Sequence, residues 1–534
     1  MTITSARPVD ADVLREMIVN DGELALLDLR ETGVFARSHL LHAVSLSLSR
    51  LELHIDALVP RRSVAVVLVA GAGDENLIET GARRLTNFGY TDILYLAGGV
   101  EAWAKAGFEL FSGVNVPSKA LGEFVEAEYE TPHIVASELK VMQNRGDNIV
   151  ILDSRPIKEF RKMSIPGGVN VPGAELAYRV HDIVPNPETT VVVNCAGRTR
   201  SIIGAQSLIN ARIPNPVVAL ENGTMGWHLA GLELDHDKEE SFPEVSEAGL
   251  RYAGAAADVV AERFGVAQVS LETLDTWLLD ENRTTYLLDV RNPAEYRAGH
   301  GPGTRSAPGG QLVQATDEYV GVRGARLVLV DDDGVRATMT ASWLIQMGWD
   351  DVHVLIGGST SDGLVTGTHH AAILGLDDCD IEEVDVEQLA ELLDRGQVVV
   401  VDVAKSIYYQ SGHIPGAWFA IRSRMPANLD KVPMAPLLVL TSKHGILARL
   451  AAVDATLSRR RVQVLAGGTD AWVEAGLSLE SGFAHMADEP EDRWYKPYDL
   501  DEGNDKEMRK YLSWEVDLVS QIERDGTARF RTFE

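Results

Sequence analysis

The chain has 534 residues, of which 45% are hydrophobic and 24% charged, and its formal net charge at pH 7 is −30. This length exceeds what one hydrophobic core supports and predicts several domains. The strong negative charge disfavours binding to nucleic acids or to an anionic membrane surface. No run approaches 18 apolar residues, and the first residues lack the apolar core of a signal peptide, so neither a membrane span nor secretion is expected.

One sequence pattern occurs four times, and we number its copies repeats 1 to 4. Each copy holds an apolar strand ending in Asp, a turn of small residues, a β-branched run, a helix, and a last strand ending in a glycine pair or its equivalent. The strand-Asp segments are 26–30, 151–155, 287–291 and 400–404, the turns are 38–43, 163–168, 299–304 and 412–417, the β-branched runs are 64–69, 190–194, 327–330 and 437–440, and the last strands end at 96–99, 220–223, 355–358 and 465–468. Such repetition predicts four structural units.

The order of these elements predicts an α/β fold. Apolar runs that alternate with helical patterns indicate βαβ units, in which a parallel sheet is flanked by helices on both faces. Aromatic residues near the end of the chain predict that the tail packs against a domain, and an arm that binds a partner is the alternative. The expected boundaries are 1–118 for repeat 1, 128–236 for repeat 2, 237–264 for a linker helix, 265–372 for repeat 3, 378–483 for repeat 4 and 484–534 for the C-terminal tail.

The sequence contains two cysteines, Cys195 and Cys379. Two are too few for a disulfide framework or a metal cluster, so no metal and no cofactor are predicted, and a reducing cytoplasm is the expected location. Cys379 lies in an acidic stretch that disfavours a thiolate, and we assign it no role. Cys195 follows a β-branched run directly, at the carboxyl end of a predicted parallel strand, where such sheets bind ligands.

Several of these segments together resemble the rhodanese (sulfurtransferase) family. The matching marks are strand-Asp-x-Arg, GHIPGA at 412–417, AGGTDAW at 466–472, and a strand-Cys-loop-helix at repeat 2. The resemblance covers nearly the whole chain up to about residue 483 and implies four tandem rhodanese-like domains. It also implies that an inactive domain packs on an active one, which would pair repeat 1 with repeat 2 and repeat 3 with repeat 4.

In that family a cysteine at the head of a six-residue loop carries sulfane sulfur as a persulfide. The matching residue is Cys195, the predicted nucleophile. The other repeats offer no thiol: Ala70, Asp331, and either Thr441 or Ser442 stand at that place. The resemblance therefore implies that repeat 2 is catalytic and the other three are inactive. The residues expected to bind the substrate are Ala196, Gly197, Arg198, Thr199, Arg200 and Ser201, with Ser201 opening the helix.

The charges of this loop predict its electrostatics. A helix N-terminus and the guanidinium groups of Arg198 and Arg200 are expected to lower the pKa of the Cys195 thiol. The planar guanidinium also suits the sulfonate of an anionic donor such as thiosulfate.

Three further residues are candidates for a second layer of side chains that holds the loop residues in place. They are Asp153, Arg155 and Glu221. Asp-x-Arg also occurs in repeats 1 and 3, which lack the thiol, so a structural ion pair is the favoured interpretation for the first two.

The predicted function is transfer of sulfane sulfur from an anionic donor, thiosulfate or similar, to cyanide, a thiol or a protein acceptor. One alternative is a Cys-dependent phosphatase or an arsenate reductase-like enzyme. A related fold carries Cys-x5-Arg loops for that chemistry, whereas Cys195 to Arg200 is Cys-x4-Arg. A second alternative is a sulfur-binding scaffold or regulatory protein, in which all four repeats only bind.

Overall fold

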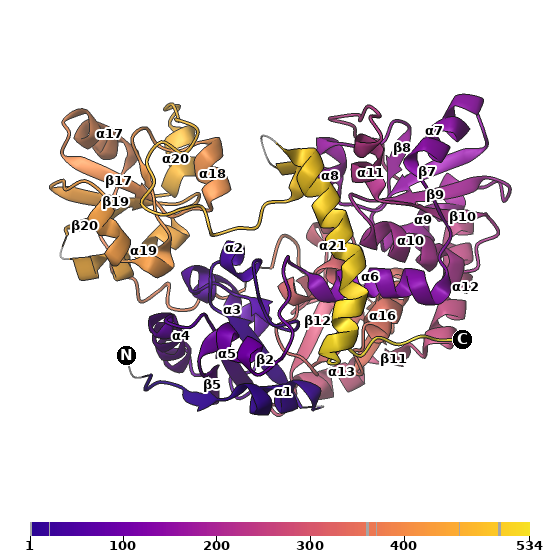
Figure 1. Ribbon diagram of the computed structural model, residues 1–534, viewed down its shortest axis with the longest axis horizontal. Coiled ribbons are helices and arrows are strands. Elements are labelled where there is room, and N and C mark those ends of the chain that lie inside the picture. Colours follow the sequence, from indigo (N-terminus) through magenta and orange to yellow (C-terminus); the bar gives the residue numbers. More distant parts are fainter. Residues whose placement is uncertain (1–2, 21, 359–362, 370, 459, 500–502) are drawn as a thin grey trace. The chain divides into compact units, whose positions relative to one another are not determined.

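The computed structural model describes residues 3–20, 22–358, 363–369, 371–458, 460–499 and 503–534. Over these residues the chain forms four five-stranded sheets, one in each repeat (Figure 1). Each sheet has its strands in the order first, fifth, fourth, second, third, and the recorded strand pairs within the sheets are parallel. The predicted α/β fold of parallel sheets flanked by helices is confirmed.

The elements follow the chain order that the sequence pattern predicts. Repeat 1 contains β1 (Arg7–Val9), α1 (Ala11–Val19), β2 (Leu24–Asp28), α2 (Thr32–Phe35), β3 (Val44–Ser45), α3 (Leu51–Leu58), β4 (Ala65–Val69), α4 (Glu75–Asn87), β5 (Ile93–Leu96) and α5 (Gly99–Lys105). Repeat 2 contains β6 (His133–Ile134), α7 (Ala136–Arg145), β7 (Ile149–Asp153), α8 (Ile157–Lys162), β8 (Gly168–Asn170), α9 (Glu175–Ile183), β9 (Thr190–Asn194), α10 (Thr199–Asn210), β10 (Val217–Leu220) and α11 (Gly223–Leu229), after the connecting helix α6 (Val116–Tyr129).

The second half of the chain continues in the same way. Helix α12 (Glu247–Phe264) lies within the expected linker and leads into repeat 3, with β11 (Ala267–Val269), α13 (Leu271–Leu278), β12 (Thr285–Asp289), α14 (Pro293–Ala298), β13 (Arg305–Ser306), α15 (Gly309–Gln314), β14 (Arg326–Val330), α16 (Val335–Gln346) and β15 (Val352–Leu355). Repeat 4 contains β16 (Glu383–Val384), α17 (Val386–Asp394), β17 (Val398–Asp402), α18 (Ser406–Ser411), β18 (Trp418–Phe419), β19 (Leu437–Thr441), α19 (Ile446–Ala455), β20 (Val462–Leu465) and α20 (Gly468–Glu474), and the tail forms α21 (Asn504–Asp525).

An ion pair closes the end of the second strand in repeat 2. Arg155 donates to the carboxylate of Asp153 from Nε (2.8 Å) and Nη2 (2.7 Å), and Nη2 also donates to the carbonyl of Met163. Both partners are fully buried. Equivalent buried pairs occur in repeats without the thiol, at Asp28–Arg30 and Asp289–Arg291. The pair therefore holds the strand to the following turn, as its recurrence in the sequence indicates.

The repeats associate in an order that the resemblance does not predict. The first compact unit joins repeat 1 to repeat 4, and the second joins repeat 2 to repeat 3 and the tail. The expected pairing of repeat 1 with 2 and repeat 3 with 4 is wrong. The units consist of Met1–Arg15, Ala25–Val114 and Ala371–Tyr495 in the first, and of Glu16–Leu24, Asn115–His370 and Lys496–Glu534 in the second.

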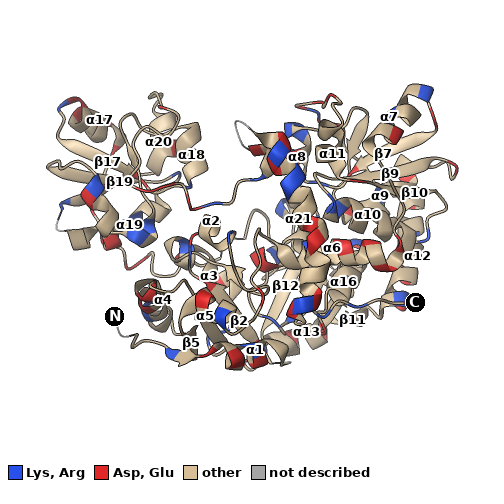
Figure 2. Ribbon diagram, in the orientation of Figure 1, with Lys and Arg blue, Asp and Glu red and all other residues tan. Residues whose placement is uncertain are grey.

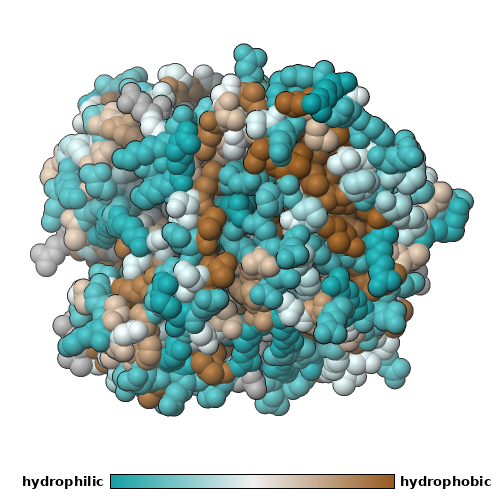
Figure 3. Space-filling model, turned by 45° about the vertical axis from the view of Figure 1, so that its right-hand side comes forward, coloured by the Kyte–Doolittle hydropathy of each residue, from teal (hydrophilic) through white to brown (hydrophobic). Residues whose placement is uncertain are grey.

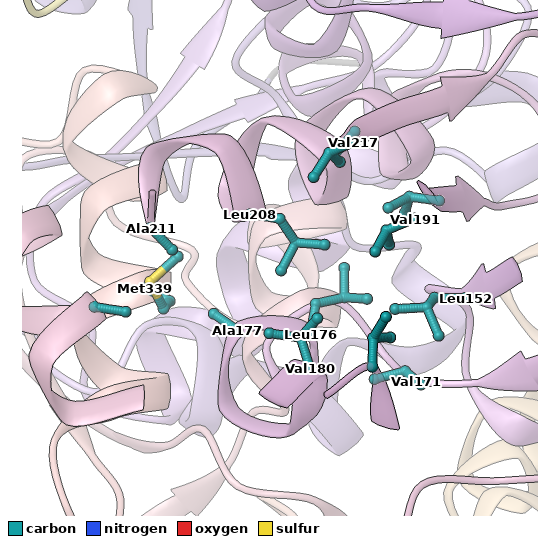
Figure 4. Close-up of a cluster of buried hydrophobic side chains, with 14 of the residues drawn as sticks. Leu152, Val171, Leu176, Ala177, Val180, Val191, Leu208, Ala211, Val217 and Met339 are labelled. Atoms are coloured by element: carbon teal, nitrogen blue, oxygen red, sulfur yellow. The ribbon is translucent and has the colours of Figure 1, made fainter. Parts of the chain in front are cut away.

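Each unit is held together by buried contacts between its two repeats. In the second unit, Met339 of α16 completes the core of repeat 2 beside Ala177 and Ala211 (Figure 4). The guanidinium of Arg336 joins Glu175 of repeat 2 (3.0 Å) to Glu295 of repeat 3 (2.7 Å). Burial of apolar surface supplies most of the attraction, while the paired charges make the match between these two repeats specific.

Comparable ionic contacts occur in the first unit. Arg422 of repeat 4 donates twice to the carboxylate of Glu52 in repeat 1, at 2.7 and 2.8 Å. Arg422 also donates to Asp454 of its own repeat at 2.8 Å. The cation is buried, so this carboxylate pairing is part of what allows repeats 1 and 4 to close on each other.

Among the described helices none is long and apolar enough to cross a membrane. Figure 3 shows hydrophilic residues over most of the face in view, with hydrophobic residues in smaller groups between them.

Candidate active site

Cys195 lies directly after β9 and four residues before α10 begins at Thr199. The helix therefore starts two residues earlier than the sequence analysis expects, so Thr199 and Arg200 belong to its first turn. The Cys195 side chain is only 2% exposed. Placement at the carboxyl end of a parallel strand, next to a helix N-terminus, is the position where this kind of sheet binds ligands.

Backbone hydrogen bonds fasten the loop to α11. The amide of Thr224 donates to the carbonyl of Cys195 (2.8 Å), and the amide of Met225 donates to the carbonyl of Ala196 (2.9 Å). Gly223, with φ of 51°, lies so close that any β-carbon would overlap the Cys195 carbonyl oxygen. This close approach explains why the last strand of each repeat ends in a glycine pair or in Asn-Gly.

The same contact identifies the counterparts of Cys195. The equivalent glycines of the other repeats crowd the carbonyl oxygens of Ala70, Asp331 and Ser442. The sequence left Thr441 and Ser442 open for repeat 4, and the structure selects Ser442, because Thr441 is the last residue of β19. None of these three residues carries a thiol.

The thiol itself is held by Ser201. The Ser201 hydroxyl donates to Cys195 Sγ at 3.0 Å, while the Ser201 backbone amide donates to the carbonyl of Arg198 at 3.0 Å. A sulfur anion at this place would accept the bond from the hydroxyl. Ser201 is thus the donor that favours an anionic sulfur from the first turn of α10.

The two loop arginines occupy different environments. Arg198 donates to both oxygens of Glu123 (2.7 Å each) and also to Glu126, so its charge is directed toward α6. Arg200 donates to Glu159 at 2.8 Å and lies close enough to Cys195 to lower the pKa of its thiol. Each cation is already paired with a carboxylate, which the sequence analysis did not anticipate.

The expected net lowering of the thiol pKa is wrong for this closed structure. Burial raises the pKa of the Cys195 thiol and outweighs Arg200 and Ser201, which lower it, while Glu515 raises it further. The unfavourable free energy of removing a thiolate from water is larger than the stabilisation that the guanidinium of Arg200, itself paired with Glu159, gives it. The balance of these effects therefore leaves the pKa of the Cys195 thiol above its ordinary value.

The C-terminal tail packs against repeat 2, as its aromatic residues predict, and it covers the cysteine loop. Helix α21 packs against α6 and crosses it in the view of Figure 1, and both helices carry charged residues (Figure 2). Leu512 and Met508 of α21 form an apolar cluster with Met225, the residue that bonds the loop. A β-carbon at Gly197 would lie 2.9 Å from Met225 Cε and 3.0 Å from Glu515 Oε2. Gly197 therefore allows the tail to approach the loop closely.

A second group of charged residues accompanies this cover. Glu515 Oε1 accepts hydrogen bonds from Tyr511 (2.9 Å) and from Thr199 (3.4 Å). The ammonium of Lys119 on α6 lies over the rings of Tyr511 and Trp514. Burial raises the pKa of Glu515 to about 7 and lowers the pKa of Lys119 to about 8, although each group's charge favours ionisation of the other.

The remaining predicted residues lie outside the thiol's immediate surroundings. Asp153 and Arg155 bond each other at the end of β7 and reach the loop through Asn194, whose amide donates to Asp153 at 2.8 Å. Glu221 is partly exposed and lies near His133 and Asn222. No recorded bond joins Glu221 to the loop over the described residues.

Sequence reasoning missed the carboxylates that face the loop. Glu123 lies in α6, between the expected end of repeat 1 and the expected start of repeat 2, and Glu515 lies in the tail. Glu159 lies in repeat 2, but on a helix with no pattern that points to Arg200. The sequence pattern that identified the site is confined to the four repeats, so nothing in the sequence connected Glu123 or Glu515 to the cysteine loop.

A small cavity lies beside α10, between repeats 2 and 3 of the second unit. Arg200 lines it, together with Ser154, Gly173, Ala174, Ile203, Gly204, Ser207, Gly309, Gly310, Val313, Gln314, Met339, Thr340 and Trp343. Arg200 thus connects the cysteine loop to this space. Among the described residues, no cluster of three or more His, Cys, Asp or Glu side chains is arranged to hold a metal ion.

Comparison with known proteins agrees with the repeat analysis. A family model described as rhodanese-like domain matches residues 10–106, 135–230, 270–361 and 385–475. The solved structure of a thiosulfate sulfurtransferase from Pseudomonas aeruginosa is similar over 99% of this chain and 100% of its own, with 47% sequence identity and a TM-score of 0.95.

Two curated proteins match shorter parts of the chain. An HTH-type transcriptional regulator from Mycobacterium tuberculosis is 30% identical over 102 residues, which is 19% of this chain and 44% of the regulator. A candidate sulfur carrier protein from Bacillus subtilis is 27% identical over 117 residues, which is 20% of this chain and 62% of the carrier. The chain thus spans less than two thirds of each of these two relatives.

Proposed function

The chain belongs to the rhodanese-like family of sulfurtransferases, and we propose that it moves sulfane sulfur from thiosulfate to a nucleophilic acceptor through a persulfide on Cys195. The observation that carries the proposal is the thiol of Cys195 at the end of β9, hydrogen-bonded by Ser201, in the repeat that alone has a cysteine at this position. Thiosulfate as donor is supported by the activity named for the similar Pseudomonas enzyme.

The reaction has two displacements. The Cys195 thiolate attacks the outer sulfur of thiosulfate, a sulfur–sulfur bond to Cys195 forms, and the sulfur–sulfur bond of thiosulfate breaks as sulfite leaves with the electron pair. A cyanide ion or a thiolate, including one on a protein, then attacks the outer sulfur of the persulfide. Cys195 recovers the electron pair as a thiolate, which closes the cycle.

The geometry supports distinct roles within the loop. Ser201 stabilises the sulfur anion directly, and Arg200 supplies the nearest cation. The backbone from Ala196 to Ser201 stays the proposed cradle for the donor. Arg198 is paired with both Glu123 and Glu126 of α6, so we propose that it holds the loop against α6.

Sulfur transfer is better supported than the alternatives. A phosphatase of the related fold needs the longer Cys-x5-Arg loop, whereas α10 begins at Thr199 and makes this loop short. A pure scaffold has no need of a thiol bonded by Ser201 at a strand end. A free thiol that cycles through a persulfide suits a reducing compartment such as the cytoplasm, which we keep as the proposed location.

Mass spectrometry after incubation with thiosulfate tests the proposal. The peptide that contains Cys195 is expected to gain one sulfur atom, and cyanide is expected to remove it. C195S is expected to lose thiocyanate formation entirely, because no other described residue near the loop offers a thiol.

The matched control is C379S, which removes the other cysteine and is expected to keep both the mass gain and the activity. A wild-type Cys195 peptide that gains no sulfur, or an active C195S variant, contradicts the proposal.

A further inference from the structure

The residues proposed to hold the sulfur donor are covered in this structure. Cys195 is only 2% exposed, and Ala196, Arg198, Thr199 and Ser201 are buried with it. Thiosulfate has to bring its outer sulfur into contact with the Cys195 thiolate, and sulfite has to leave again. Neither step can take place while these residues are shut off from solvent, so an element that covers the loop must move.

Helix α6 is firmly attached to the loop that it covers. Arg198 of the loop donates to both carboxylate oxygens of Glu123 on α6, at 2.7 Å each. Leu121 and Val125 of the same helix belong to a hydrophobic cluster that includes Trp343 of repeat 3. Movement of α6 would break a buried ion pair and this cluster together, so α6 is the fixed side of the site.

Helix α21 is attached to the loop by weaker interactions. Leu512 and Met508 form a small apolar cluster with Met225, the residue whose amide bonds the loop. The hydroxyl of Thr199 donates to Glu515 Oε1, but at 3.4 Å this is long for a hydrogen bond between two oxygens. Undocking of α21 therefore costs less than undocking of α6.

The docked helix also leaves polar atoms unsatisfied. Glu515 Oε2 and Trp514 Nε1 are buried without a hydrogen-bond partner among the described residues. Each of them would form hydrogen bonds with water when α21 leaves the loop, and this gain offsets part of the apolar contact that is lost. The free-energy difference between the docked and the undocked helix is reduced accordingly.

The far end of the tail is held independently of the loop. Phe530 packs against Phe124 of α6. The amide of Phe533 donates to the hydroxyl of Tyr129 at 3.0 Å, and its carbonyl accepts from Arg263 of α12 at 2.9 Å. The first half of α21 can thus leave the loop while the end of the tail stays attached.

We propose that the first half of α21, residues 504–515, is a lid that leaves the cysteine loop to admit the sulfur donor and closes again between turnovers. The closed lid shields the Cys195 thiol from water and from other thiol reagents. The open lid exposes the loop to thiosulfate and then to the acceptor. The inference rests on the proposed role of Cys195 as the sulfur carrier.

Alkylation of Cys195 and hydrogen exchange of α21, measured on the full-length protein, test the proposal together. The probe is iodoacetamide, and the rate is taken on the plateau at high pH, where the thiol is fully ionised and access limits the reaction. Comparison with the unfolded chain gives the fraction of molecules in which Cys195 is accessible. This fraction is expected to equal the open fraction that amide exchange gives for residues 504–515.

Substitutions on α21 separate lid opening from loss of the fold. L512A removes apolar contact with Met225, and we expect alkylation, exchange of residues 504–515 and sulfur loading at low thiosulfate each to become at least about tenfold faster. M508A trims the same cluster and is expected to act in the same direction. V516A is the matched control, because Val516 is 51% exposed, and all three rates are expected to stay unchanged. Peptides of β9 are expected to exchange as in the wild type in every variant.

The proposal is overturned if Cys195 in the wild type is alkylated faster than opening of residues 504–515 allows, because the reagent then enters by another route. Rates in L512A and M508A that equal those of the wild type overturn it as well. Failure of the proposed function is a separate result, in which the Cys195 peptide gains no sulfur from thiosulfate. Alkylation and exchange are measured without a sulfur donor and do not depend on it.

Discussion

At the scale of single residues, the reactivity of Cys195 depends on a competition between burial and nearby charge. Burial raises the pKa of the thiol, Arg200 and Ser201 lower it, and Glu515 raises it again. Arg198, only three residues away in sequence, directs its charge to Glu123. Proximity in sequence is therefore a poor guide to which cation acts on the sulfur.

We expect R200M and R198M to differ for this reason. R200M removes the cation that lowers the pKa of the Cys195 thiol. When the rate of alkylation of Cys195 by iodoacetamide is plotted against pH, the midpoint is expected to rise, and the thiolate fraction at pH 7 is expected to fall about tenfold. The KM for thiosulfate is expected to rise as well. Both quantities are measured on the purified full-length variants.

R198M serves as the matched comparison. It leaves Glu123 buried without its main partner, which costs about 3–5 kcal/mol of folding stability, but the alkylation midpoint is expected to move far less than in R200M. Equal shifts of the midpoint in the two variants would show that both arginines act on the sulfur.

At the scale of elements, the end of the second strand is built in two ways. Three repeats close it with an Asp–Arg pair, while repeat 4 has Ala404 where the arginine would stand. Asp402 is buried there and accepts a bond from the Ala404 amide at 2.8 Å. Burial without a cation raises its pKa to about 7.

Asp402 therefore makes stability fall as pH rises. Below about pH 4 the carboxyl is neutral in both the folded and the unfolded chain. Between about pH 4 and 7 only the folded state keeps the proton, so stability drops, and above about pH 7 the loss is complete. D402N keeps the oxygen acceptor and is expected to stabilise repeat 4 by about 2–4 kcal/mol at pH 8 and little at pH 4.

Thermal unfolding at the two pH values measures this effect. D289N is the control, because Asp289 is paired with Arg291 in repeat 3 and its neutralisation is expected to destabilise the fold at pH 8. A D402N variant that is less stable than the wild type at pH 8 contradicts the argument.

At the scale of the whole molecule, the four repeats form two compact units. One unit joins the first and last repeats of the chain, and the other joins the two middle repeats. The buried arginines at these contacts differ: Arg336 bonds Glu175 and Glu295 in one unit, and Arg422 bonds Glu52 in the other.

Hydrogen exchange can distinguish this pairing from that expected by resemblance. R336M is expected to raise exchange in peptides of repeats 2 and 3, because it removes the cation that joins buried Glu175 of repeat 2 to half-buried Glu295 of repeat 3. R422M is expected to raise exchange in repeats 1 and 4. Increased exchange in repeats 1 and 2 together, or in 3 and 4 together, would contradict the pairing.

The fold and the nucleophile's position could be predicted from the sequence, because both follow from local patterns. Buried parallel strands appear in the sequence as runs of β-branched residues, and Cys195 follows one of these strands directly. The glycine pair marks the place where the backbone comes close to the loop carbonyl. The start of α10 was misplaced by two residues, since Thr199 and Ser201 are both acceptable helix openers.

The repeated α/β unit and the one repeat with a thiol follow from the amino-acid pattern alone, since steric and hydrophobic periodicity act between near neighbours in the chain. Which repeats associate, and which charges reach Cys195, depends on the folded arrangement. Glu515 is 320 residues away in sequence, yet its buried carboxylate faces the cysteine loop. Burial and Coulomb interactions depend on distance in space, and folding alone sets that distance.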